Sequence, residues 1–223
     1  MKNLVYCLKK ALYLIVLIGL STAHAGSFDD FFTAIKRDDP DTIKALLRRG
    51  FDANTPDLAG QTGLFLALRE PSLKVAQVLI DWPKTTVESR NLKDESPLMI
   101  AAINGQLDIC QKLITRGADV NKTGWTPLHY AASRGHLDVI NLLLENYAYI
   151  DAESPNKTTP LMMAASYSTP ETVQLLLDAG ADPTIKNQLG LTAIDFAQRA
   201  GKGDAAEMIA AFMRKQRAAK GKW

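Results

Sequence analysis

The thirteen residues GWTPLHYAASRGH, at positions 124–136, decide the fold of this chain. Thr126 carries a hydroxyl that can accept a hydrogen bond from a free backbone N–H at the start of a helix. Pro127 suits the first helical position, where its missing N–H costs nothing. Gly135-His136 then reads as a turn toward a following helix. The stretch therefore predicts a short, capped helix that leads into a second one.

The same pattern recurs along the chain at nearly constant spacing. Its cap residues are Thr62, Ser96, Thr126, Thr159 and Thr192, which lie 34, 30, 33 and 33 residues apart. A second apolar stretch follows four of these caps, at 75–80, 109–114, 139–144 and 173–177. The distance from each cap to the position that ends the second helix is always 21 residues (62 to 83, 96 to 117, 126 to 147, 159 to 180). The distance from there to the next cap varies from 9 to 13 residues. Because packed helices must keep their length while loops tolerate insertion, the units are predicted to be helix pairs joined by variable loops.

The stretch from Gly124 to Ala132, followed by Gly135-His136, resembles the ankyrin-repeat signature. The resemblance implies an all-α ankyrin-repeat solenoid of about six helix-turn-helix units with β-hairpin-like finger loops. Counting back 21 residues from Gly50 makes Asp29 the first N-cap, and counting forward from Thr192 ends the last repeat at Met213. The predicted domain covers 26–213, with units at about 26–56, 57–90, 91–120, 121–153, 154–186 and 187–213, followed by a basic tail at 214–223.

Three features depart from the family pattern. Pro83 and Tyr147 stand where the family usually has glycine. We expect the helix before Pro83 to end early, and the left-handed conformation near Tyr147 to shift to Asn146. The connector from Ala118 to Trp125 is three residues short, so its finger should be clipped. The shortening is either a harmless deletion or a notch that shapes a binding surface.

The first 25 residues resemble an export signal. Three lysines (Lys2, Lys9, Lys10) precede an apolar run at 11–20, and Ala23-His24-Ala25 offers a cleavage site. Ten apolar residues are short for a membrane span, although a tether over an uncleaved segment 4–20 is the alternative. Cleavage near Ala25 predicts a periplasmic or secreted protein with no permanent membrane span. It removes three of 26 basic residues and none of 24 acidic ones, which leaves a net charge of about −1 and no general affinity for nucleic acid.

Few side chains offer chemistry. Cys7 would leave with the signal, and Cys110 is predicted to be a small buried hydrophobe. His129 and His136 match framework positions that hydrogen-bond within ankyrin repeats. These residues make a poor zinc ligand set, so no catalytic residue, cofactor or metal is predicted. A thiol-dependent redox factor that uses Cys110 is the rival of another class.

The resemblance instead points to a partner-binding face made of fingers and inner-helix ends. Its candidate residues are Arg69, Glu70, Lys93, Glu95, Asn104, Trp125, Arg134, Asn156, Thr158, Tyr167 and Arg199. Trp125, Tyr167 and the two C-terminal arginines of this set are the strongest, because aromatic residues and arginine dominate interface hot spots. Leu58, Leu92 and Leu189 are expected to pack finger against finger.

We therefore predict a non-catalytic protein–protein interaction module in the periplasm, monomeric, whose concave finger and inner-helix face binds one protein partner. Within this class, an inhibitor or immunity protein for a secreted toxin or lipase is the sharper alternative. The tail at 214–223 carries five basic residues and no acid. It is either a solvated end or a segment that rests on anionic lipid or a partner.

Overall fold

The computed structural model describes residues 26–220, apart from the side chains of residues 219 and 220. Two compact units, with their boundary between Thr85 and Thr86, make up the chain. The regular structure of the described residues is helical, and extended pairing there is limited to one bridge between Pro56 and Thr62. The predicted export signal lies outside the described residues. Nowhere between 26 and 220 is there a helix both long and apolar enough to cross a bilayer.

The N-terminal unit contains a helix over 26–36 and three more helices. These are α2 (Pro40–Arg48), α3 (Gly63–Arg69) and α4 (Leu73–Asp81). Asp39 caps α2, because its Oδ1 accepts hydrogen bonds from the backbone N–H groups of Asp41 and Thr42, both at 3.1 Å. Residues 26–30 are already helical, so the expectation that Asp29 is an N-cap is wrong. Phe31 is fully buried and stacks on Phe51 at a ring distance of 4.6 Å.

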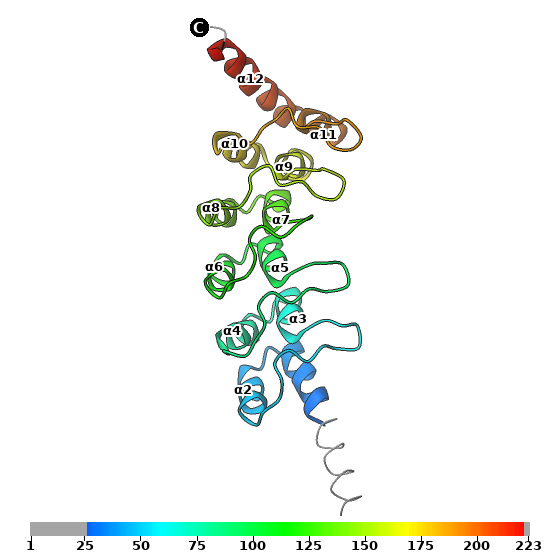
Figure 1. Ribbon diagram of the computed structural model, residues 1–223, viewed down its shortest axis with the longest axis vertical. Coiled ribbons are helices and arrows are strands. Elements are labelled where there is room, and N and C mark those ends of the chain that lie inside the picture. Colours follow the sequence, from blue (N-terminus) through cyan, green and yellow to red (C-terminus); the bar gives the residue numbers. More distant parts are fainter. Residues whose placement is uncertain (1–25, 221–223) are drawn as a thin grey trace, which may run out of the picture. The chain divides into compact units, whose positions relative to one another are not determined.

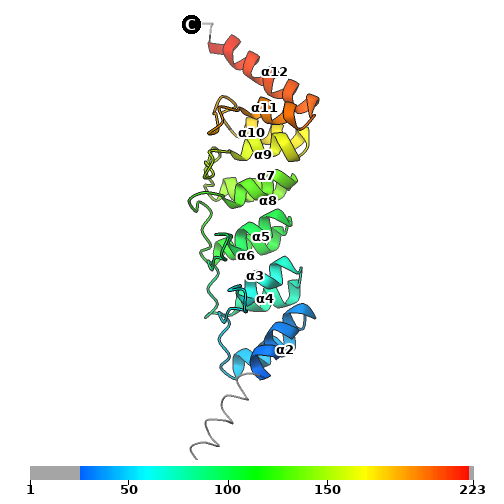
Figure 2. The same cartoon turned by 90° about the vertical axis from the view of Figure 1, so that its right-hand side faces the viewer.

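The C-terminal unit repeats the helix pair along the chain. Its helices are α5 (Pro97–Ile103), α6 (Leu107–Thr115), α7 (Pro127–Arg134), α8 (Leu137–Glu145), α9 (Pro160–Tyr167), α10 (Pro170–Asp178), α11 (Ala193–Arg199) and α12 (Gly203–Lys220). Within this unit, α5, α7, α9 and α11 form an inner row and α6, α8 and α10 an outer row (Figure 1). Figure 2 shows the long loops between successive repeats of this unit on one side of its helices.

The predicted caps and alanine pairs explain this stacking. Ser96, Thr126, Thr159 and Thr192 are the N-caps of the four inner helices, as the repeat pattern predicts. The Ser96 hydroxyl accepts from the Met99 N–H at 3.3 Å. The alanine pairs 101–102, 131–132 and 164–165 are all fully buried. Small side chains at these places let neighbouring inner helices approach closely and bury the larger aliphatic side chains around them.

Each long finger of the C-terminal unit is a hairpin-like turn without a regular strand. The backbone N–H groups of Asn91, Ser154 and Asn187 each donate to the carbonyl four residues later, at 3.0–3.1 Å. Asn91 Oδ1 and Asn187 Oδ1 also accept from the backbone N–H groups two and four residues on. A polar side chain therefore closes the turn from inside, as Asx turns do.

The leucines at the finger tips face solvent. Leu58, Leu92 and Leu189 are 100%, 93% and 76% exposed, so the expectation that they pack finger against finger is wrong. The reason is that backbone and Asx hydrogen bonds already close each turn, and the tip side chain is turned outward. These exposed apolar tips become available to a partner.

Of the two positions where the family usually has glycine, Pro83 behaves as predicted and Tyr147 does not. Helix α4 ends at Asp81 with Trp82 in an extended conformation, so the early stop before Pro83 is confirmed. Tyr147 itself adopts the left-handed conformation at φ +63°, whereas Asn146 stays at φ −97°, so the predicted shift to Asn146 is wrong. The Asn146 amide Nδ2 donates to the Leu142 carbonyl at 2.8 Å, so this side chain is engaged with the helix that it ends.

The last helix is longer than the repeat count predicts. Met213 does not end it, because α12 runs on to Lys220 (Figure 1). Residues 204–220 contain no glycine or proline and are rich in strong helix formers such as alanine, lysine and arginine, so nothing in this stretch stops the helix. The exposed residues Arg214, Lys215 and Arg217 therefore lie on a helix and not in an irregular tail.

Candidate protein-binding site

A groove of about 370 Å³ lies between the fingers and inner helices of the C-terminal unit. We call it the finger groove. Its lining residues are Trp125, Asn156, Thr158, Met163, Ser166, Tyr167, Asn187, Leu189, Leu191, Phe196 and Arg199. Helices α9 and α11 supply its wall, and the loops that precede α7, α9 and α11 supply its rim. Five of the residues predicted from the repeat pattern are thus brought together in one place.

Trp125 lies at the border between the finger groove and a second hollow. This second hollow has a volume of about 190 Å³ and is lined by Ile103, Trp125, Tyr130, Ser133 and Met163. The Trp125 ring meets the His129 ring edge-on at a centroid distance of 5.2 Å. The half-buried indole therefore has one contact that orients it and surface left over for a partner.

The clipped connector before Trp125 is organised by a buried lysine. Lys122 is 3% exposed, and its Nζ donates to Asp94 Oδ2 at 2.6 Å and to the carbonyl oxygens of Thr123 and Trp125 at 3.0 and 3.1 Å. These three bonds use all three ammonium protons. The hydrogen bond from Lys122 is the main cause that holds the pKa of the Asp94 carboxyl below its usual range. The Lys122 ammonium thus connects the backbone at Trp125 to Asp94 of the preceding finger.

His129 connects two repeats from a fully buried position. Its Nδ1 accepts from the Thr126 N–H at 3.2 Å, so the neutral ring carries its proton on Nε2, which donates to the Thr158 carbonyl at 2.8 Å. Burial lowers the pKa of His129 to about 4, although the bond to Thr158 acts in the opposite direction. His136 Nε2 lies 3.0 Å from the Ile103 carbonyl. Both histidines therefore have the framework role expected of them.

Thr158 differs from its predicted role as a surface contact. It is 2% exposed, its N–H donates to Ser154 Oγ at 2.9 Å, and its carbonyl accepts the His129 bond. Thr158 lies at the base of its finger, where backbone groups must be paired within the protein. It shapes the floor of the finger groove but offers a partner little surface.

The remaining candidates of the C-terminal unit line neither hollow. Lys93 is exposed at a finger tip, and Asn104 and Arg134 are exposed at the ends of α5 and α7. Glu95 is half-buried, because Oε1 accepts from the Tyr130 hydroxyl at 3.2 Å and Oε2 from the Asn91 amide at 2.8 Å. Burial, together with the Glu95 charge, raises the pKa of Tyr130. Glu95 therefore positions Tyr130 at the second hollow.

Arg69 and Glu70 belong to a separate groove in the N-terminal unit. The two side chains form an ion pair at 3.0 Å, and Arg69 also donates to Gln61 Oε1 at 2.7 Å. This groove, of about 320 Å³, is lined by Phe28, Phe32, Ile35, Lys36, Asp57, Leu58, Leu66, Arg69 and Glu70. An ion pair at an exposed site contributes little to stability, so these side chains remain available at the rim.

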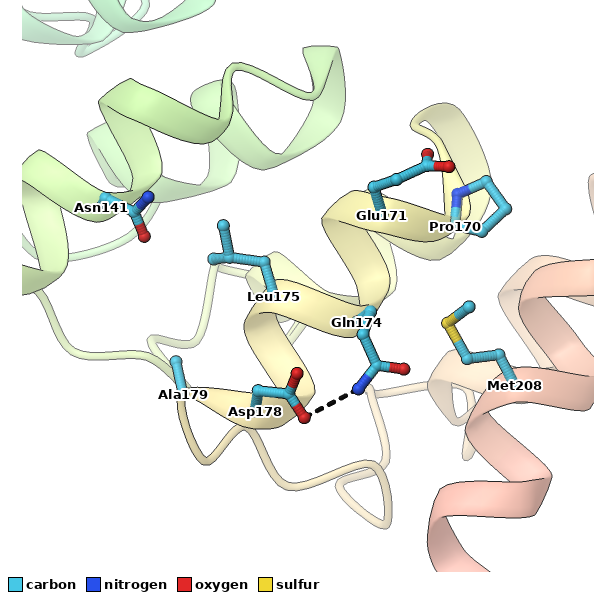
Figure 3. Close-up of a pocket in the computed structure, with 8 residues that line it drawn as sticks. All are labelled: Asn141, Pro170, Glu171, Gln174, Leu175, Asp178, Ala179 and Met208. Carbon is cyan, nitrogen blue, oxygen red and sulfur yellow. Dashed lines mark hydrogen bonds between the residues drawn. The ribbon is translucent and has the colours of Figure 1, made fainter.

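A wider depression of about 660 Å³ lies on the opposite, outer helices of the C-terminal unit. Figure 3 shows Leu175 and Gln174 of α10 between Asn141 of α8 and Met208 of α12. Gln174 Nε2 donates to Asp178 Oδ1 at 2.7 Å (dashed line in Figure 3). The depression has no aromatic side chain among its lining residues, and none of the predicted partner residues lies there.

Cys110 lies on the buried face of α6 and is 0% exposed, as predicted for a small hydrophobe. Burial raises the pKa of its thiol to about 12. A thiol with so high a pKa is almost entirely protonated at neutral pH, and the thiolate is the reactive form. Among the residues from 26 to 220, no three His, Cys, Asp or Glu side chains are grouped so that they could hold a metal ion.

The repeat pattern alone missed several residues of the two hollows. These are Ile103, Tyr130, Ser133, Met163, Ser166, Asn187, Leu191 and Phe196. All of them lie on inner helices or finger bases, where the pattern predicts packing and not exposure. Met163 and Phe196 are half-exposed, and a one-dimensional pattern does not contain the contacts between repeats that decide this exposure.

The chain matches family models over most of its length. A model of ankyrin repeats in three copies matches residues 31–123 and 83–154, and a model of ankyrin repeats in many copies matches residues 143–197. The ankyrin repeat protein YahD of Escherichia coli K12 is 28% identical over 192 residues, which cover 82% of this chain and 94% of YahD. The mouse nuclear factor NF-kappa-B p105 subunit is 31% identical over 147 residues, but the match spans only 15% of its length.

A solved structure shares the fold. It is described as the Bd0816 predatory endopeptidase from Bdellovibrio bacteriovorus in complex with immunity protein Bd3460. The matched chain is 27% identical, with a TM-score of 0.72, and the match covers 82% of the present chain and 97% of that chain. Family models, relatives and helix-pair geometry agree. The chain belongs to the ankyrin-repeat family.

Proposed function

We propose that this protein is a non-catalytic binding module that captures one protein partner in the finger groove. The observation that carries the proposal is the convergence of Trp125, Tyr167 and Arg199 on one concave, partly apolar surface. Aromatic residues and arginine at the centre of a concave patch are typical of interface hot spots. Ankyrin repeats suit such a role, because their framework residues carry the fold and leave the finger side free to vary.

A second candidate function is that of an inhibitor or immunity protein for a secreted enzyme. The observation that favours it is the likeness to a chain from the endopeptidase–immunity protein complex, at a TM-score of 0.72 over 97% of that chain. A rigid rim with exposed apolar tips such as Leu189 would cover an active site without any change of shape. Titration of a co-purified enzyme with this protein tests the idea, and full enzyme activity at saturation contradicts it.

The proposed place of action is the periplasm or the cell exterior, after cleavage near Ala25. The support is the sequence of residues 1–25 alone. Mass spectrometry of the exported protein should find Gly26 at the N-terminus. An intact Met1 in exported material would overturn the cleavage and favour a membrane tether. The buried Cys110 thiol, with its raised pKa, gives no support to the redox alternative.

Two tyrosines of equal exposure test the location of the binding site. Tyr167 lines the finger groove and is 67% exposed, whereas Tyr149 is 68% exposed and lines none of the hollows described above. In capture from a periplasmic extract of the native host, Tyr167→Ala should lose the partner that the parent retains, and Tyr149→Ala should retain it. Equal capture by all three proteins would remove the finger groove from the interface. Equal loss of the partner by both variants would mean that the substitutions act through folding and not through the finger groove.

A further inference from the structure

Charge in the finger groove is concentrated on one side chain. Of its lining residues, all of which the structure describes, Arg199 alone carries a formal charge. The others are apolar or aromatic, such as Leu189 and Phe196, or neutral and polar, such as Asn156 and Asn187. Arg199 is exposed at the C-terminal end of α11. A single cation beside apolar surface in a concave site favours one sign of charge in whatever enters it.

The charges around Arg199 do not cancel it. Asp195 lies one turn earlier on α11, but its Oδ2 already accepts from the backbone N–H and the hydroxyl of Thr192, each at 2.7 Å. These two bonds are the main cause that lowers the pKa of Asp195, and the positive charges of Arg199 and Lys186 lower it further. Asp195 therefore stays ionised, and Arg199, Lys186 and Asp195 together carry a net charge of +1 at this end of the groove.

The apolar part of the site has two compartments. Trp125 and Met163 line both the finger groove and the second hollow, so they form the ridge between them. The ridge is half-buried and adjoins the shortened connector, whose backbone Lys122 holds through a hydrogen bond to the Trp125 carbonyl. Volumes of about 190 and 370 Å³ accommodate one or two large side chains each. A bound segment can thus insert side chains on either side of Trp125.

We propose that this site selects a protein segment in which an aspartate or glutamate accompanies large apolar side chains, with Arg199 as the residue that recognises the acidic group. The inference rests on the proposed function and adds the chemistry of the partner. It also assigns the shortened connector a role in binding, because this connector carries Trp125 and Lys122 fixes its backbone.

Selection from a library of random short peptides displayed on phage tests the inference with the full mature chain. Arg134 supplies a matched control, since it is also an exposed arginine at the end of an inner helix but lines neither hollow. The parent should enrich peptides that combine acidic and large apolar residues. Arg199→Glu should bind those peptides about tenfold more weakly and enrich basic peptides instead, because it reverses the charge that steers binding. Arg134→Glu should bind them within about twofold of the parent.

The outcomes separate this inference from the proposed function. One outcome is that Tyr167→Ala loses the peptides while Arg199→Glu binds them as the parent does. This outcome would overturn the acidic selection and leave the finger groove as the site. Peptides that bind all variants equally would place binding elsewhere and contradict both. Equal weakening by Arg199→Glu and Arg134→Glu would show a general charge effect and overturn the role of Arg199. A parent that enriches no peptide would count against both proposals.

Discussion

At the scale of single residues, the histidine of the repeat signature connects structure to pH. His129 is buried in its neutral form between the Thr126 cap and the Thr158 carbonyl, so it serves one helix start and the finger base of the next repeat. That finger base is also the floor of the finger groove. Protonation would place a buried positive charge between the neutral groups of Thr126 and Thr158, and it would break the bond from the Thr126 N–H to Nδ1.

The pH dependence of stability should therefore report His129. Its pKa is about 4 in the folded protein, against an ordinary value of 6.5, so between these values the unfolded chain binds the extra proton. The contribution is complete above pH 6.5 and is lost as the pH falls toward 4, by up to about 3 kcal/mol. Urea unfolding across this range should show a shallower loss for His129→Gln than for the parent. His136→Gln is the control and should keep the steep loss; parallel curves for His129→Gln and the parent would contradict the assignment.

Tyr147 stores backbone strain where other repeats use glycine. It has φ +63°, the conformation that Gly117 and Gly180 adopt at the same place in their units. A left-handed conformation costs a residue with a Cβ roughly 1–2 kcal/mol. Tyr147→Gly should thus raise the free energy of unfolding by about 1 kcal/mol in chemical denaturation, since the Tyr147 ring is exposed and its carbonyl can still accept from Asn121. Tyr149→Gly, where the backbone is not left-handed, should lower the free energy of unfolding. An increase in both variants would contradict backbone strain at Tyr147.

At the scale of elements, hydrogen bonds hold the shortened finger in a defined conformation. The neighbouring fingers close on Asn91 and Ser154 with hairpin-like turns, whereas the connector before α7 closes on the buried ammonium of Lys122. Arg90 adds ion pairs to Asp94 at 3.3 Å and Asp119 at 3.6 Å on the same side. Hydrogen bonds of this kind replace the rigidity that a longer turn would supply.

Removal of the Lys122 charge should cost stability. Lys122→Met keeps most of the length of the side chain but removes the donor to the Thr123 and Trp125 carbonyls. Hydrogen bonds to a charged group contribute about 1.5–3 kcal/mol, so the free energy of unfolding should fall by about 2 kcal/mol. Lys93→Met, at an exposed finger tip, should change it by less than about 0.5 kcal/mol. Two equal effects in calorimetry would mean that the Lys122 bonds do not hold the connector.

Helix pairs were predictable from the sequence, whereas the details of the site were not. Caps at Ser96 and Thr159 and a fixed spacing of 21 residues depend on local backbone chemistry, which a sequence carries directly. The sequence also grouped Trp125 and Arg199 as surface candidates, and the structure brings both to the finger groove. The bond from Lys122 to Asp94 spans 28 residues, and Met163 lines both hollows together with residues of neighbouring repeats. Such contacts between repeats arise from packing in three dimensions, so no local pattern contains them.

At the scale of the whole molecule, an ankyrin chain is a series of similar parts, each stabilised by its neighbours. In the C-terminal unit, α7 packs between α5 and α9, and α11 packs on α9 (Figure 1). Stability in such arrays is close to a sum of repeat and nearest-neighbour terms. A defect in one repeat should therefore spread to adjacent repeats and fade beyond them. The finger groove, which takes residues from three successive repeats, depends on this coupling.

Leu128 provides the test of that coupling. It is fully buried in α7, and Leu128→Ala should lower the free energy of unfolding by about 2–5 kcal/mol through lost burial and a cavity. Hydrogen–deuterium exchange should rise first in α7 and then in α5 and α9, which pack directly on it, with smaller changes in α12. Leu58→Ala, at a fully exposed tip, should leave exchange in these helices as in the parent. A uniform rise over the whole C-terminal unit would mean that it unfolds as one block, and the finger groove would then be lost in a single step instead of repeat by repeat.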